Sequence, residues 1–246
     1  MLGKSFKMKL NNLKKIAVNA ARKAGEFLIK NKNEAKEVLL DEGRDIKLIL
    51  DQETEKIIRS SLAASNIEIM GEEFGGVKKE DKYWVVDPID GTANYFRGLD
   101  ECCVSIALME GNKALIGVIY NFNNNQMYEA IKDHGAFLNN KKISVSDIAL
   151  KSKASITTGF PASETVESSI NFLMDLKGWK KVRMFGSAAL SCAYVASGKC
   201  DYYAEKGVYL WDFAAGICLV EESGGNITYS LIDKDRYEVI ASNGLV

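Results

Sequence analysis

The sequence predicts a mixed α/β (α+β) protein, with an antiparallel-rich sheet in its first half and an α/β lobe in its second. Apolar runs separated by turn residues follow one another between residues 102 and 131, which is typical of antiparallel strands. From about residue 150, apolar strands alternate with helical patterns. The 246 residues, 47% of them hydrophobic and 26% charged, suit one large globular domain or two small ones.

The composition limits the possible partners and compartments. A net charge of -1 gives no general attraction to nucleic acid or to anionic membranes. No stretch approaches the ~20 apolar residues that span a bilayer, and the basic N-terminus lacks the apolar core of a secretory signal. Five cysteines without a CxxC pair favour buried, reduced thiols and a cytoplasmic location. The only histidine, His134, leaves little material for serine–histidine or cysteine–histidine catalysis.

The first predicted elements are a basic helix and a strand–helix pair. Apolar residues recur with helical spacing from Leu10 to Phe27, and the lysines of this region form its solvated face. Residues 45–50 favour a strand, after which a helix begins with Asp51 as its candidate N-cap. Residues 67–70 favour a short strand that ends in a glycine-rich loop with two adjacent glutamates.

The stretch WVVDPIDGT, residues 84–92, organises the first half. An apolar strand delivers Asp87 to a turn, which Pro88 and Gly91 favour because proline fixes φ and glycine allows positive φ. Two close carboxylates repel one another unless a cation lies between them, and hard oxygen ligands suit Mg²⁺. The amides of Gly91 and Thr92 could receive a phosphate. An ordinary turn explains these residues about equally well.

A β-hairpin is predicted for residues 102–120, with a further strand at 126–131. The later change of pattern divides the chain into an N-terminal lobe, residues 1–145, and a C-terminal lobe, residues 146–246, with the site at their junction. The second lobe is predicted to contain strands at 154–158, 181–185 and 200–204, and helices near 164–176, from 187 and from 212.

Acidic residues recur at the ends of these elements, each followed by a loop or a helix start. They are Asp51, Glu72, Asp87, Asp90 and Asp212. Each one alone is explained by a cap or a turn, which are the commonest roles of such residues. Together they indicate a metal site that distant segments form in the folded chain.

The motifs resemble those of the inositol monophosphatase family of Mg²⁺-dependent, lithium-sensitive phosphatases. The resemblance runs from about Ala17 to Gly225, and its signatures are WVVDPIDGT at 84–92 and WDFAAG at 211–216. The order and spacing of the Gly-Glu-Glu loop and of ESGG at 222–225 agree as well. The resemblance implies a layered α-β-α-β-α sandwich of the sugar phosphatase type, a homodimer, and two or three Mg²⁺ ions in each site.

The resemblance also implies which residues hold the metal. Glu72, Asp87 and the backbone carbonyl of Ile89 would hold one Mg²⁺. Asp87, Asp90 and Asp212 would hold a second, and Glu72 would help with a third ion.

The catalytic positions follow from the same resemblance. Thr92 matches the residue that activates a water molecule, with Asp51 as its partner, and Glu72 acts through the metal. The amides of Gly91 and Thr92 would bind the phosphate. Because attack on a phosphate monoester needs mainly positioning and charge neutralisation, a chain with one histidine can catalyse it.

Positions that contact the hydroxyl groups of the substrate in this family match Asp90, Ser187, Ala188 and Glu205. Arg183 could instead reach a second phosphate, as in fructose 1,6-bisphosphate, although a surface arginine at a strand edge is about as plausible. A plain N-cap is the simpler explanation for Ser187.

The predicted function is Mg²⁺-dependent hydrolysis of a small phosphate monoester, with inositol 1-phosphate favoured. Fructose 1,6-bisphosphate and 3′-phosphoadenosine 5′-phosphate are the alternative substrates. The alternatives without catalysis are a metal- or phosphate-binding module and a scaffold that uses the basic N-terminal helix. Thr92 beside Asp51 distinguishes an enzyme from a binding module, since a pure binder needs no hydroxyl to orient water.

Overall fold

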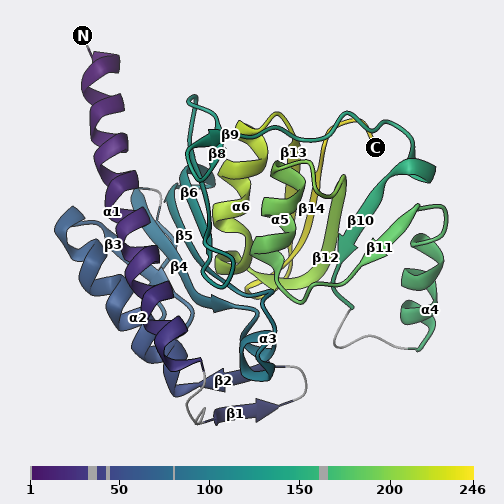
Figure 1. Cartoon of the computed structure of the whole chain (residues 1–246), viewed down its shortest axis with the longest axis horizontal. Helices are drawn as coiled ribbons and strands as arrows, with labels where there is room; N and C mark the ends of the chain where they lie inside the picture. The colour runs from purple at the N-terminus through teal and green to yellow at the C-terminus, as the bar shows by residue number, and fades with distance from the viewer. Residues whose placement is uncertain (1, 33–37, 43–44, 80, 161–165) are drawn as a thin grey trace.

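Helices and sheets alternate in five layers (Figure 1). Helices α1 (Leu2–Asn31) and α2 (Ile49–Leu62) cover the outer face of a seven-stranded sheet. Helices α5 (Ala188–Ala196) and α6 (Leu210–Glu222) lie between that sheet and a five-stranded sheet, and α4 (Val166–Asp175) flanks the far side. The predicted α-β-α-β-α sandwich is therefore confirmed. The structure, a computed structural model, describes residues 2–32, 38–42, 45–79, 81–160 and 166–246.

The seven-stranded sheet has its strands in chain order and is antiparallel except for the pair β3–β4. This confirms the predicted antiparallel-rich first half, including the hairpin β5–β6. The strands are β3 (Glu68–Gly71), β4 (Lys82–Asp90), β5 (Cys103–Glu110), β6 (Lys113–Asn121), β7 (Gln126–Ile131), β8 (Ala136–Leu138) and β9 (Lys141–Lys142).

The five-stranded sheet has the order β11-β10-β12-β14-β13. Its first two pairs, β11–β10 and β10–β12, are parallel, and the pairs that include β14 are antiparallel. The C-terminal hairpin β13–β14 was not assigned from the sequence, and the lobe boundary between residues 145 and 146 stays a prediction. The strands are β10 (Ser155–Thr158), β11 (Lys181–Arg183), β12 (Tyr202–Tyr209), β13 (Asn226–Asp233) and β14 (Arg236–Ser242).

The outer core lies between α1, α2 and the seven-stranded sheet. One face of α1 is buried from Leu10 to Leu28, and four alanines on that face allow the helix to lie close to β5 and β6. Burial of a leucine side chain contributes ~1.5–3 kcal/mol, so this helix is part of the core. Lys15 and Lys23 are exposed, which confirms the solvated face. Deleting α1 would therefore remove core packing as well as charge. None of the described helices is long and apolar enough to span a bilayer.

The inner core lies between the two sheets and contains α5 and α6, which are apolar on nearly every side. Small residues let the elements approach closely: a Cβ on Gly216 would lie 2.5 Å from the Cβ of Cys192. Cys102 and Cys103 belong to opposite cores, as residues of adjacent positions in a strand do. All five cysteines are free and buried, which confirms the predicted inert thiols.

Candidate active site

The end of β4 carries two of the predicted acids. The turn expected directly after Asp87 is wrong, because β4 continues through Asp90. Its pairing with β5 shifts by one residue between these two acids, so that Pro88 and Ile89 lie in a β-bulge. A bulge tolerates proline since no ladder hydrogen bond is required there, and it re-aims neighbouring side chains. The amide of Ile89 donates to Asp87 Oδ1 at 3.0 Å, which fixes that carboxylate.

The chain turns at Gly91, directly after the bulge. Gly91 has φ +90°, and a Cβ there would lie 2.8 Å from the carbonyl oxygen of Glu101 and 3.1 Å from that of Gly186. Only glycine suits both the backbone angle and the space. Helix α3 (Thr92–Arg97) follows at once, so Gly91 fixes the position of the Thr92 hydroxyl.

Helix α2 supplies Asp51 to the same place. The helix begins at Ile49, so Asp51 lies in its first turn, and the predicted N-cap position is wrong. Its side chain is buried, and Thr92 Oγ1 lies 3.2 Å from Asp51 Oδ1 and 2.8 Å from the carbonyl oxygen of Ile89. A hydroxyl has one proton, so it donates to one of these oxygens and can accept from a third group.

The Gly-Glu-Glu loop follows β3, which pairs in parallel with β4. Gly71 pairs with Val86, and the amide of Glu72 donates to the carbonyl of Val86 at 3.3 Å. Glu72 therefore lies beside Asp87, as the order of the strands predicted. Its charge contributes to raising the pKa of Asp87.

Glu55 is a site residue that the sequence reasoning missed. Its side chain is completely buried one helical turn after Asp51. Its carboxylate accepts from the amide of Glu73 at 2.7 Å and from Arg59 Nε at 2.7 Å. A Cβ on Gly71 would collide with this carboxylate. Glu55 thus fastens the loop that carries Glu72 to helix α2. Its place on the apolar face of α2 was the signal that could have revealed it.

Asp212 comes from the start of α6. The helix is preceded by Tyr209, whose amide donates to Asp212 Oδ2 at 2.8 Å. Asp212 is therefore the third helical residue, and its expected N-cap position is wrong by three residues. Tyr209 stacks on Trp211 with ring centroids 4.6 Å apart, and the guanidinium of Arg236 lies 3.9 Å from the centre of the Tyr209 ring. These contacts fix the helix start that carries Asp212.

Asp90 faces the start of α5. Ser187 Oγ and the amide of Ala189, at 2.8 Å, donate to Asp90 Oδ2, while the amide of Ala188 lies 3.3 Å from Oδ1. Ser187 also caps α5 by accepting from the amide of Leu190 at 3.2 Å, which confirms the N-cap assignment. Burial raises the pKa of Asp90 to about 6, although these hydrogen bonds act in the opposite direction.

Three of the predicted acids form a tight cluster. Asp87, Asp90 and Asp212 each offer a carboxylate oxygen, and these oxygens lie within 4.8 Å of one another. Burial raises the pKa of Asp87 and of Asp212 well above the usual range, and repulsion from neighbouring carboxylates adds to it. Buried like charges so close together require a proton or a cation between them. Asp51 and Glu72 lie beside this cluster, since both add to the repulsion on Asp87.

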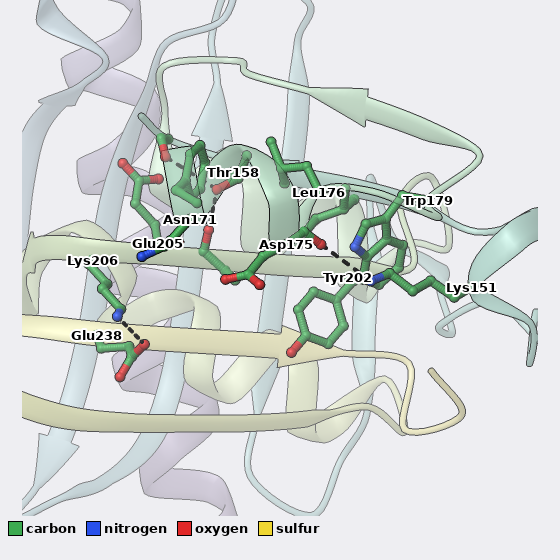
Figure 2. A pocket seen from close by; sticks show the side chains of 14 residues that line it. Lys151, Thr158, Asn171, Asp175, Leu176, Trp179, Tyr202, Glu205, Lys206 and Glu238 are labelled. Atoms are coloured by element: carbon green, nitrogen blue, oxygen red, sulfur yellow. Dashed lines mark hydrogen bonds and ion pairs between the residues drawn. The ribbon is translucent and has the colours of Figure 1, made fainter. Parts of the chain in front are cut away.

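Glu205 and Arg183 line different cavities beside the five-stranded sheet. Glu205 lines a cavity of about 560 Å³ together with Ile156 and Thr158 (Figure 2). Arg183 pairs with Thr157, whose side chain points to the α5 side, and lines a separate cavity of about 370 Å³. The structure does not bring these two predicted substrate contacts together.

Known proteins are similar to this chain over most of its length. The model of the inositol monophosphatase family matches residues 9–240. An inositol-1-monophosphatase of Mesorhizobium japonicum is 35% identical over 241 residues, which cover 94% of this chain and 89% of that protein. A protein named Nus factor SuhB from Xylella fastidiosa is 38% identical over 219 residues, covering 86% and 80%. The crystal structure of extragenic suppressor protein suhB from Bartonella henselae has a TM-score of 0.87 at 33% identity, covering 94% and 93%.

Proposed function

The chain belongs to the inositol monophosphatase family and is a phosphoric monoester hydrolase, and we propose that it is Mg²⁺-dependent and prefers inositol 1-phosphate. The observation that carries the proposal is the cluster of Asp87, Asp90 and Asp212, whose oxygens lie within 4.8 Å of one another. With Asp51 and Thr92, three separate segments of the chain meet there: the end of β4 with the start of α3, the start of α2, and the start of α6. A homodimer, lithium sensitivity and a cytoplasmic location stay predictions.

The donor set fits Mg²⁺. Carboxylate oxygens are the hard ligands that this ion prefers. Two of the three clustered side chains are buried and the third is partly buried, so a cation would relieve the repulsion among them. The proposed ligands are Glu72, Asp87, Asp90, Asp212 and the carbonyl of Ile89. When bound, Mg²⁺ neutralises the phosphate dianion and acidifies a water molecule.

Thr92 and Asp51 are proposed to orient the attacking water. Thr92 Oγ1 lies 3.2 Å from Asp51 Oδ1 and 2.8 Å from the carbonyl of Ile89, so two acceptors restrict the hydroxyl. With its proton directed to one of them, its lone pair is left to accept from water. Because Asp51 is buried and comes from a core helix, this geometry is rigid before the substrate arrives.

The substrate is proposed to lie between the end of β4 and the start of α5. The amides of Gly91 and Thr92 would bind the phosphate, and Gly91 allows the backbone to turn at that point. Ser187 and Ala188 contact Asp90, so a hydroxyl of the leaving group would meet all three together. Glu205 would accept from another hydroxyl. Each of these groups suits a neutral polyol.

A monophosphate is favoured over a bisphosphate. Arg183, the residue expected to reach a second phosphate, lines a different cavity from Glu205. The described residues around Glu205 include the carboxylates of Asp175 and Glu238, which would repel a second phosphate. This supports inositol 1-phosphate over fructose 1,6-bisphosphate.

The experiment that tests the proposal is phosphate release by the purified protein with and without Mg²⁺. The substrates are inositol 1-phosphate, fructose 1,6-bisphosphate and 3′-phosphoadenosine 5′-phosphate. We expect activity only with Mg²⁺ and the highest kcat/KM for inositol 1-phosphate. A preference of more than about tenfold for the bisphosphate would reject the substrate assignment, and full activity in excess chelator would reject the metal.

A further inference from the structure

A second region beside the site remains without a role in phosphate hydrolysis. The cavity of about 560 Å³ lies between α4 and the outer face of β10 and β12 (Figure 2). Its volume falls within the ~300–1,000 Å³ typical of small-molecule sites. Glu205 and Thr158 lie toward one end, and Trp179 and Lys151 lie toward the other (Figure 2). A ligand held at Glu205 would therefore have room to extend toward Trp179.

Glu205 connects this cavity to the carboxylate cluster. Its negative charge contributes to raising the pKa of Asp212, so the two carboxylates are close enough to interact. Glu205 Oε2 accepts from the hydroxyl of Tyr203 at 3.1 Å, and Gly159 lies against the carboxylate so closely that a Cβ there would collide with it. The position of Glu205 is thus fixed at the boundary between the reacting centre and the cavity.

The far end of the cavity has an aromatic wall. The rings of Trp179 and Tyr202 lie with centroids 5.0 Å apart and planes inclined by 42°. Lys151 Nζ lies 5.1 Å from the centre of the Trp179 ring and donates to the carbonyl of Asp175 at 3.3 Å. Phe172 and Leu176 add apolar surface. Such a wall suits the C–H face of a ring that also carries hydrogen-bonding groups.

The charges of the cavity exclude a strongly anionic ligand. Among the described lining residues, three carry carboxylates, namely Asp175, Glu205 and Glu238, and two carry ammonium groups, Lys151 and Lys206. Lys206 is paired with Glu238 at 3.5 Å. The lining therefore offers acceptors for hydroxyl groups and no excess of cations for a phosphate.

We propose that this cavity is a subsite for a neutral second ring on the leaving group, so that the enzyme accepts phosphorylated glycosides larger than a single sugar or polyol. The inference rests on the proposed phosphatase function. In this arrangement the ring that bears the phosphate contacts Glu205, and a second sugar ring lies against Trp179 and Tyr202. The carboxylate of Asp175 lies between the two ends and could accept from the hydroxyls of that second ring (Figure 2).

Trehalose 6-phosphate and glucose 6-phosphate test this proposal, because they share the same phosphorylated ring and differ by one neutral ring. We expect a kcat/KM about tenfold higher for trehalose 6-phosphate, with the difference in KM. Trp179→Ala should bring the ratio close to one, and Trp179→Phe should keep part of the preference. Leu173→Ala is the matched control on α4, since Leu173 is exposed and does not line the cavity.

A ratio of one or less in the unmodified enzyme, or a preference that survives in Trp179→Ala, overturns the proposal. If neither sugar phosphate is hydrolysed, isothermal titration of both compounds into the protein decides the question without turnover. Tighter binding of trehalose 6-phosphate that is lost in Trp179→Ala supports the subsite, and equal binding of the two compounds rejects it. Failure of hydrolysis with every monoester in the presence of Mg²⁺ would instead reject the proposed function.

Discussion

The carboxylate cluster and the cavity under α4 are built in different ways. Each acid of the cluster comes from an element that is fixed by the core, and each is anchored by backbone hydrogen bonds at its own position. Most of the side chains that line the cavity are partly or fully exposed, although Ile156 and Thr158 are buried. The outer wall of the cavity is a ten-residue helix whose Leu173 and Met174 are exposed. The difference indicates that the carboxylates of the cluster are held rigidly, while the recognition of the leaving group can change by substitution of surface residues.

The largest effect is expected from Asp87→Asn. This change removes one negative charge from the centre of the cluster, and several kcal/mol of charge stabilisation should be lost with the metal. We expect kcat/KM for the preferred monoester to fall by about 10³-fold or more. Phosphate release at saturating Mg²⁺ measures this effect.

The fold should survive that substitution. Neighbouring carboxylates raise the pKa of Asp87, so a neutral amide of similar shape removes repulsion from the metal-free protein. We expect the Tm of the metal-free variant to equal or exceed that of the parent. Asp81→Asn, at an exposed position, is the matched control and should leave activity unchanged. Retained activity in Asp87→Asn would show that the cluster does not hold the catalytic metal.

A smaller loss is expected from Thr92→Val. The substitution keeps the shape of the side chain and removes the hydroxyl that contacts Asp51 and Ile89. We expect kcat to fall by about 10²-fold with little change in KM, since a positioned proton acceptor contributes ~10²–10⁴-fold. Thr92→Ser keeps the hydroxyl and should recover most of the activity. Equal losses in both variants would assign a packing role to Thr92.

These two predictions concern residues that the sequence could identify. Asp87, Asp90 and Asp212 lie within recognisable motifs at or near the ends of their elements, and the parallel pairing of β3 with β4 places Glu72 beside Asp87. The bulge at Pro88 could not be predicted, because it depends on the register of β4 against β5, and no local sequence pattern fixes that register.

Two other features could not be predicted from the sequence, because they also depend on tertiary contacts. Arg183 and Glu205 line different cavities, and that depends on how β11 and β12 pair with β10. The cavity under α4 depends on how a surface helix sits over the sheet, and no local pattern records this. The sequence therefore indicated the class of reaction, while the pairing of strands and helices determined which residues surround the carboxylate cluster.

A positioning effect is expected from Glu55→Ala. Glu55 is completely buried and accepts from the amides of Glu73 and Phe74 and from Arg59. Loss of a buried, paired carboxylate destabilises a protein by ~3–5 kcal/mol. Because the same contacts hold the loop of Glu72, we expect Mg²⁺ affinity to fall by about tenfold.

Mn²⁺ binding followed by electron paramagnetic resonance measures this affinity without turnover. Glu55→Gln keeps one acceptor oxygen and should fall between the parent and Glu55→Ala. Glu68→Gln is the control, because Glu68 is exposed and its ion pair with Lys79 contributes ~0–1 kcal/mol. A variant that loses stability but binds Mn²⁺ as tightly as the parent would limit Glu55 to a structural role.

The smallest effect is expected in the pH dependence of stabilisation by Mg²⁺. Burial raises the pKa of Asp90 to about 6, against about 3.8 for a free side chain. The raised pKa adds to the free energy of unfolding below pH ~4, where the side chain is protonated, and this addition is lost as the pH rises through 6. The metal-free protein is therefore less stable at pH 7.5 than at pH 5. The full shift of about 2 pKa units corresponds to about 3 kcal/mol, of which about half is lost between pH 5 and pH 7.5. The pKa values of Asp87 and Asp212 are shifted in the same direction.

Mg²⁺ binds the ionised carboxylates, so it should restore the stability that the metal-free protein loses at high pH. We expect Mg²⁺ to raise Tm by ~3–6 °C more at pH 7.5 than at pH 5, since 1 kcal/mol corresponds to ~2–4 °C in a protein of this size. His134→Gln is the control, because histidine is the usual group that titrates in this range, and that variant should behave like the parent. Stabilisation by Mg²⁺ that is independent of pH would mean that the clustered carboxylates are already ionised without metal. The cluster would then not depend on a cation, and its contrast with the cavity under α4 would be wrong.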